Sequence, residues 1–197
     1  ASGAQKGYMI PPGLSFISMS QKAWEAAEKS NLPKFYLNLK SYRKSLLSNS
    51  NPYTPAVNLI FALDEALKMM REEGLDNIFF RHNKHKLAVS NAMKALNLKL
   101  FADEKYLSPS ITAIKTGEMD AEEFRKTIKN NFDILLAGGQ DHLKGKIFRV
   151  GHLGYVNDRD IITVISAISN TLISLGKITT HQAGEALAVV SKYLAEN

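Results

Sequence analysis

Apolar residues recur at helical spacing along six stretches of the chain, and this pattern predicts six helices. Ser20 is a suitable N-cap for the first helix, which we expect to end at Lys29. For the second helix we expect Thr54 at the N-cap and Pro55 at the first helical position, with Gly74 closing the element. A third helix is predicted over about 76–97. The next two begin at the caps Asp120 and Asp158 and end at about 132 and about 176, respectively, and the last runs from Thr180 to about 194.

Short runs of β-branched and aromatic residues alternate with these helices and predict strands over 14–20, 98–101, 110–115 and 147–156. A further short apolar run covers 35–39 and is followed by a polar stretch, in which Ser48–Pro52 are predicted to form a loop. The alternation of strands and helices predicts an α/β or α+β architecture, with a domain boundary near residues 90–100.

Composition narrows the classes of function. Of the 197 residues 45% are hydrophobic, as in ordinary globular proteins. The net charge of +6 is dispersed, and no block of five like charges marks a nucleic-acid arm. A nucleic-acid-binding protein, the rival hypothesis, would need a basic stripe, so we expect no nucleic-acid partner.

Three features of the sequence bear on location and on metals. No apolar stretch reaches the roughly 20 residues of a membrane span, so no membrane association is expected. The first residues resemble neither a secretory signal nor an amphipathic presequence, which predicts a cytoplasmic protein. The chain has no cysteine, and this excludes disulfides, thiolate metal sites and a cysteine nucleophile.

Two groups of residues are candidates for chemistry on residue type alone. Lys6 lies between Gln5 and Gly7 in a glycine-rich turn, where an amine could act as a Schiff-base nucleophile or could simply be solvated. His82 and His85 are three residues apart on a predicted helix and could bind a metal. No neighbouring carboxylate or cysteine completes such a metal site, so we expect a solvated helix face and no metal.

Three motifs in order resemble the class V, fold type I pyridoxal-phosphate (PLP) aminotransferases, in the alanine-glyoxylate and serine-pyruvate branch. The motif SGAQKG at 2–7, with PPG at 11–13, is similar to the cofactor-lysine segment of that family. It is followed by NPYTPAV at 51–57, and then by GG at 138–139 and FRVGHLG at 148–154. The absence of cysteine argues against the cysteine desulfurases, which share this fold and need a thiol.

The resemblance implies a role for each matching residue. Lys6 would form the Schiff base with PLP and act as the catalytic base, and Gln5 would help to hold the cofactor phosphate. Thr54 would reach the phosphate of the neighbouring subunit of a homodimer with shared active sites. Asn51 stands where mammalian members have a tyrosine, so a phosphate contact from Asn51, or from Tyr53 in its place, is a further expectation. Arg149 would bind the substrate α-carboxylate.

The same resemblance implies an architecture and a reaction. The cofactor lysine of this family lies near mid-chain, so the sequence is expected to be the C-terminal half of such an enzyme, with the N-terminal half as its partner. Residues 1–90 would end the large PLP-binding domain, and 91–197 would form the small α+β C-terminal domain. The enzyme would transfer an amino group from alanine, serine or a similar amino acid to a 2-oxo acid such as glyoxylate or pyruvate. This half alone would be inactive; the alternative is a non-catalytic subunit or regulatory module that retains the fold.

Overall fold

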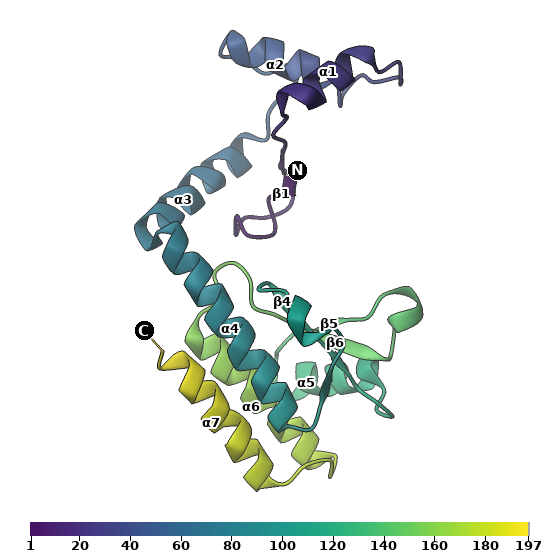
Figure 1. The fold of residues 1–197 in the computed structure, drawn as a ribbon, viewed down its shortest axis with the longest axis vertical. Helices are drawn as coiled ribbons and strands as arrows, with labels where there is room; N and C mark the ends of the chain where they lie inside the picture. Colours follow the sequence, from purple (N-terminus) through teal and green to yellow (C-terminus); the bar gives the residue numbers. More distant parts are fainter. Residues whose placement is uncertain (197) are drawn as a thin grey trace. The chain divides into compact units, whose positions relative to one another are not determined.

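The computed structural model describes residues 1–196, which form two compact units (Figure 1). The first unit covers Ala1–Met69, and the second begins at Met70. Helix α3 (Val57–Glu73) starts in the first unit, and its last residues belong to the second. The division lies about 20 residues before the expected boundary near residue 90, because the next helix, α4, packs within the second unit. The assignment of 1–90 to a large cofactor domain stays a prediction.

The first unit consists of a short β-ribbon and helices. Strands β1 (Ser2–Gly3) and β2 (Ser15–Phe16) pair antiparallel, with Ser2 opposite Phe16. Helix α1 (Gln21–Lys29) begins as predicted, with the Ser20 side chain accepting a hydrogen bond from the backbone N–H of Ala23 at 3.2 Å. The strand predicted over 14–20 is thus only two residues long.

Two features of the first unit differ from the prediction. Residues 39–47, where no helix was predicted, form helix α2 (Leu39–Leu47), which is capped by Asn38 and presents Leu39 and Tyr42 on one side at a spacing of three. Helix α3 begins at Val57 and not at Pro55, so Thr54 is not its N-cap. The first helical N–H bonds go to the backbone of Pro55 and Ala56 instead.

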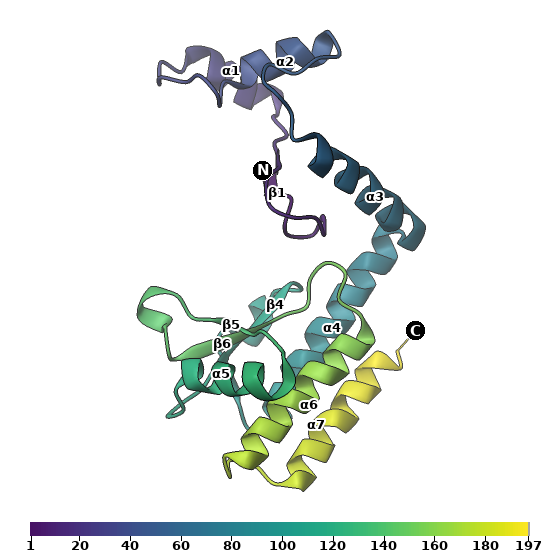
Figure 2. The ribbon, with the colours of Figure 1, turned by 180° about the vertical axis from the view of Figure 1, so that it is seen from behind.

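The second unit packs helices against one antiparallel sheet (Figure 2). The strand order is β3-β4-β6-β5, so β4 and β6 are the central strands. Helices α4, α6 and α7 lie side by side in both views, and α5 packs on α6 and on β5 and β6. The bounds are α4 (Leu75–Ala95), β3 (Lys99–Leu100), β4 (Ile111–Lys115), α5 (Ala121–Phe132), β5 (Ala137–Gly138), β6 (Ile147–Gly151), α6 (Asp158–Ser174) and α7 (Thr180–Leu194), with 3-10 turns at Glu104–Tyr106 and Asp141–Leu143.

The helices and strands predicted in this unit are present with shifted ends. Asp120 caps α5 through the N–H groups of Glu122 and Glu123. The cap of α6 is Asn157 rather than Asp158, because Asn157 forms a capping box with Asp160. The extended run predicted over 147–156 ends at Gly151, and the two-residue strand β5 was not expected.

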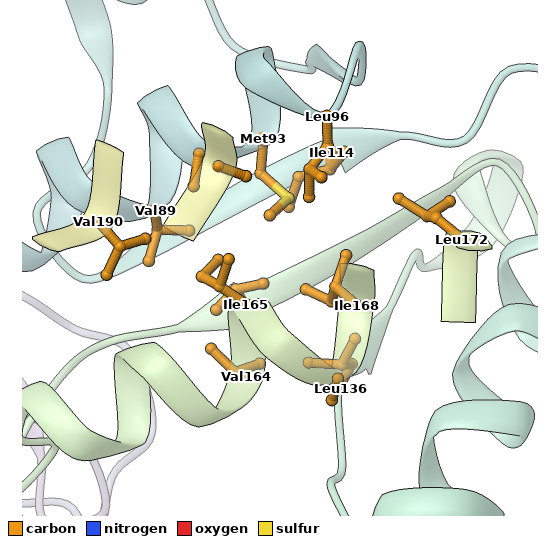
Figure 3. Close-up of a cluster of buried hydrophobic side chains, with 14 of the residues drawn as sticks. Val89, Met93, Leu96, Ile114, Leu136, Val164, Ile165, Ile168, Leu172 and Val190 are labelled. Atoms are coloured by element: carbon orange, nitrogen blue, oxygen red, sulfur yellow. The ribbon is translucent and has the colours of Figure 1, made fainter. Parts of the chain in front are cut away.

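The core of this unit joins its helices to its sheet (Figure 3). Val89 and Met93 of α4, Ile114 of β4 and Ile165 of α6 are fully buried, and Figure 3 shows Val190 of α7 beside Val89. Each such side chain stabilises the fold by about 1.5–3 kcal/mol relative to its exposed state. The sheet is therefore fixed to the helices at its central strands. Within residues 1–196 no helix is long and apolar enough to cross a membrane.

His152, the residue after β6, is fully buried. Its Nδ1 lies 3.1 Å from the carbonyl oxygen of Pro109, and its Nε2 lies 2.9 Å from Thr112 Oγ1. Because Nδ1 faces a carbonyl, it carries the proton, and Nε2 accepts from the threonine hydroxyl. Burial lowers the pKa of His152 to about 4.

We predict that stability falls as the pH drops from about 6.5 to about 4. In this window the unfolded chain protonates His152 and the native chain does not, so the free energy of unfolding decreases by about 3 kcal/mol. Denaturant unfolding followed by circular dichroism across this range measures the effect. His152→Gln should flatten the dependence, whereas His181→Gln, at an exposed histidine, should not. Equal slopes in all three proteins would contradict the prediction.

Candidate active site

Lys6 lies at the start of a tight turn at the tip of the β-ribbon in the first unit. The backbone N–H of Met9 donates to the carbonyl of Lys6 at 3.0 Å, and Met9 takes the left-handed conformation with φ 61°. Below the turn, the N–H of Ala4 donates to the carbonyl of Leu14 at 3.1 Å. The side chains of Gln5 and Lys6 are exposed. The β-ribbon thus exposes the side-chain amine of Lys6 and the side-chain amide of Gln5, while the backbone around them is held by hydrogen bonds.

Buried residues on both sides of Lys6 fix this lysine loop, which we define as residues 4–14, to helix α3. Ala4 is fully buried, Ile10 is 7% exposed, and both belong to one apolar cluster with Ala66 of α3. The cluster is bordered by Leu14, Phe16, Ala62 and Leu63. Because an apolar residue flanks the turn on each side, the backbone under Lys6 is anchored while its side chain remains accessible.

Gly13 lets the lysine loop approach α3 closely. Its φ of +143° is disfavoured for any residue with a side chain, and a Cβ atom there would lie 2.5 Å from Leu59 Cδ1 of α3. At Gly7, next to the lysine, a Cβ would meet no atom within 4 Å. The close contact is therefore on the α3 side, and the space beside Lys6 is open.

The segment of residues 51–54 presents mainly exposed polar groups. The side chains of Asn51 and Thr54 are exposed. Tyr53 is half-buried, and its hydroxyl donates to the carbonyl of Phe35 at 3.1 Å. Its ring packs on Phe35, Tyr36 and Tyr42, with centroid distances of 5.8, 4.8 and 6.0 Å. A phosphate contact by Tyr53 would require this hydroxyl to leave Phe35, whereas Asn51 and Thr54 are accessible as they stand.

Arg149 occupies the middle of β6, a central strand of the second unit's sheet. Strand alternation directs Phe148 and Val150 into the core, where they are 0% and 2% exposed, so Arg149 faces the other side. Across the ladder it is paired with Ala113 of β4 and Ala137 of β5. These small neighbours leave the guanidinium half-exposed on this face.

One hydrogen bond orients the Arg149 guanidinium. Its Nε donates to the carbonyl oxygen of Gly138 at 2.8 Å. No ion pair within residues 1–196 includes Arg149, and its two terminal nitrogens remain available for an anionic ligand. A planar guanidinium held at Nε is suited to grip a carboxylate through its terminal nitrogens.

The sequence-predicted residues are thus divided between the two units. Gln5, Lys6, Asn51, Tyr53 and Thr54 lie in the first unit, and Arg149 lies in the second. Within residues 1–196 no group of three metal-binding side chains occurs.

A network of charged and imidazole groups on α4 was not recognised as such from the sequence. His85 is fully buried with Nε2 2.7 Å from Asp158 Oδ1, and Lys84 Nζ donates to Asp158 Oδ2 at 3.2 Å. The expectation of a solvated face at His82 and His85 is therefore wrong. A signal was present, because the apolar positions 88, 89, 92 and 93 of α4, with the C-cap Leu96, extend back by helical spacing to 85 and 82.

The pKa values in this network follow from burial and pairing. Burial lowers the pKa of His85, and the hydrogen bond with Asp158 opposes that shift only in part. Burial alone would raise the pKa of Asp158, but its hydrogen bonds with His85 and Lys84 outweigh burial and lower it. The carboxylate of Asp158 is thereby kept ionised at the first residue of α6.

Comparison with known proteins identifies relatives across the whole chain. The sequence is 57% identical over 176 residues to the soluble hydrogenase 42 kDa subunit of Anabaena cylindrica, covering 89% of this chain and 46% of that one. It is 35% identical over 203 residues to the serine-glyoxylate aminotransferase of Methylorubrum extorquens, covering 100% and 50%. The chain spans about half the length of the curated relatives it matches. No family model matches.

The fold has close counterparts among solved structures. The crystal structure of a ureidoglycine-glyoxylate aminotransferase from Bacillus subtilis superposes with a TM-score of 0.86 at 28% identity. The match covers 96% of this chain and 51% of that one. The two units together therefore have the fold of about half of such an aminotransferase.

We predict that Gly13→Ala loosens the lysine loop. A side chain at this φ, placed against Leu59, should cost about 1–3 kcal/mol of local stability. Hydrogen exchange at the Ala4 amide, which is bonded to Leu14, should therefore speed up by roughly tenfold or more. Gly7→Ala is the matched control, since its Cβ would enter open space. The prediction is wrong if both variants exchange at the same rate.

Proposed function

Because this chain is homologous to the serine- and alanine-glyoxylate aminotransferases, we propose that it forms the C-terminal half of a PLP-dependent transaminase. The enzyme would transfer the amino group of a small amino acid, such as alanine or serine, to a 2-oxo acid such as glyoxylate or pyruvate. The observation that carries this proposal is the exposed Lys6 on a turn whose backbone is anchored by buried Ala4 and Ile10.

The residues of the lysine loop fit PLP in space and in chemistry. Lys6 offers a primary amine for a covalent link to an aldehyde, and the open space at Gly7 admits a bulky ring. Gln5 offers amide N–H donors next to it. Asn51 and Thr54 add an exposed amide and an exposed hydroxyl, which suit a phosphate group. When bound, PLP supplies an electrophilic carbon and an electron sink for the Cα–H bond of the substrate.

Two residues of this chain would carry out the steps that belong to the protein. The guanidinium of Arg149 would bind and orient the substrate α-carboxylate through its terminal nitrogens, with Nε held by Gly138. Lys6 Nζ, once released, would take the proton from the substrate Cα and deliver it to the carbon of the cofactor. In this proposal Lys6 carries the proton and Arg149 anchors the substrate carboxylate.

The partners that we propose follow from the same family relationship. Residues 1–90 would complete a large cofactor domain with the N-terminal half of the enzyme, and residues 91–197 would form the small domain. A homodimer would bring Thr54 of one subunit to the phosphate site of the other. Support for a covered surface comes from large apolar side chains around α2, namely Leu32, Phe35, Leu37 and Leu47, which are 72–82% exposed. We also propose a cytoplasmic location.

A second candidate function is a subunit of a larger complex, favoured by the relative that is called a hydrogenase subunit. In this case the fold would be retained without transamination. The sequence has no cysteine and so supplies no thiolate ligand for an iron or nickel centre. In such a complex these 197 residues would provide a folded binding surface for other components, and those components would supply the thiolate ligands of any metal centre.

We predict that Lys6 is the residue that PLP modifies. Borohydride reduction of the full-length protein with PLP, followed by peptide mass spectrometry, should place a pyridoxyl group on Lys6. Lys6→Ala should abolish this adduct, and Lys22→Ala, which removes an exposed lysine of α1, should leave it unchanged. An unmodified Lys6 in the full-length protein would contradict the transaminase and favour the non-catalytic subunit.

We predict that Arg149→Lys weakens binding of the amino-acid donor. A lysine retains the charge but loses the bidentate grip and the bond to Gly138, which should cost about 1.5–3 kcal/mol. KM for L-serine or L-alanine should rise by roughly 10- to 100-fold in steady-state assays with glyoxylate. Arg71→Lys, at an exposed arginine of α3, is the control. An unchanged KM in Arg149→Lys would remove Arg149 from the substrate site.

A further inference from the structure

Arg81 of α4 binds two separate segments of the second unit through a single guanidinium. Its Nε and Nη2 donate to the two carboxylate oxygens of Glu73 at 2.6 and 2.9 Å. Its Nη1 donates to the carbonyl oxygens of Gly154 and Val156 at 2.9 and 2.8 Å. Four of its five N–H donors are thus used, in a side chain that is only 19% exposed.

The carbonyls that Arg81 binds belong to the segment that follows the strand of Arg149. We call residues 152–157, between β6 and the start of α6, the β6–α6 loop. His82, the next residue of α4, accepts a hydrogen bond from the N–H of Gly154 at 3.0 Å through Nε2. Its Nδ1 lies 2.7 Å from the carbonyl of Ile78 and carries the proton. Gly154 is therefore held at both its N–H and its carbonyl by consecutive residues of one helix.

The β6–α6 loop is anchored at regular intervals along its length. His152 is bonded to Pro109 and Thr112, Gly154 and Val156 are bonded to Arg81, and Asp158, the first residue of α6, is bonded to His85 and Lys84. Between these points Tyr155 is 72% exposed. The end of β6 is thus attached to α4 mainly by side-chain hydrogen bonds, with Arg81 making two of them.

Glu73 connects this arrangement with helix α3. It is the last residue of α3, the helix on which the lysine loop packs through Ala66. The hydrogen bond from Arg81 lowers the pKa of Glu73, which keeps its carboxylate ionised. Gly74, which follows with φ +83°, makes the turn from α3 into α4. The Arg81–Glu73 pair therefore closes this turn.

We propose that Arg81 is a positioning residue for substrate binding, because it holds the β6–α6 loop, and with it the strand of Arg149, to the end of α3. This inference rests on the proposed role of Arg149 as the carboxylate anchor. A lysine at position 81 could not replace Arg81, since one ammonium cannot span a bidentate carboxylate and two carbonyl oxygens at once. Within the second unit, the loop that follows β6 and the last residue of α3 are thus joined through one side chain.

The test uses the full-length, PLP-loaded protein and the variants Arg81→Met and Arg81→Lys. We expect KM for L-serine, with glyoxylate as acceptor, to rise by about tenfold while kcat changes by less than about threefold. Hydrogen exchange at the amides of 152–156 should become faster, and the fraction of Lys6 modified after borohydride reduction should stay the same. A purely structural role would instead lower kcat and Lys6 occupancy together.

The matched control is Lys68→Met, which removes an exposed ion pair with Asp64 from α3 and should change none of these readouts. If the Arg81 variants do not fold, Glu73→Gln tests the same connection while leaving both carbonyl hydrogen bonds, and a smaller rise in KM is expected. Unchanged exchange at 152–156, or an unchanged KM, would overturn the proposal. A wild-type protein without Lys6 adduct or transamination would overturn the proposed function, and the exchange result would still show whether Arg81 holds the loop.

Discussion

The structure depends on fixing the backbone beneath a cationic side chain while leaving that side chain accessible. In the lysine loop, Ala4 and Ile10 are buried against α3 and the turn between them presents Lys6. In β6, Phe148 and Val150 are buried and Arg149 lies on the other face. Both arrangements hold a charge near a packed apolar layer without burying it, and so avoid the large desolvation cost of an unpaired buried ion.

In the second unit, by contrast, two partly buried carboxylates are paired with basic side chains. Asp158 is paired with Lys84 and His85, and Glu73 with Arg81. Within a partly buried region these charges have high mutual interaction energies, and removing one partner leaves the other uncompensated. The contrast is informative, because Arg149 in the same unit has no such acidic partner in residues 1–196, although its Nε is anchored. An arginine held at one nitrogen and unpaired at the others is preorganised for an anion that arrives from outside.

Much of the fold was predictable because most of its helices and strands are marked by local sequence signals, such as N-cap residues and alternating apolar positions. Ser20 and Asp120 cap helices at the expected places, and the alternating residues 111–115 form a strand. The errors have physical causes. Helix α2 was missed since its apolar residues are few and spaced among lysines and serines, and α3 starts late because Ala56, not Thr54, accepts its first bonds. The candidate residues Lys6 and Arg149 came from motif resemblance. The contacts of Arg81 with Gly154 and Val156, by contrast, join residues more than 70 positions apart, and no local pattern encodes them.

The division into two units gives the α3–α4 turn its significance. Lys6 belongs to the first unit and Arg149 to the second. The chain passes from one unit to the other along α3, and Gly74, with φ +83°, makes the turn into α4. The ion pair of Glu73 with Arg81 spans this turn, and Arg81 also binds the loop after β6. Charge pairing at Glu73 and Arg81 is therefore better understood as a geometric constraint than as a contribution to stability.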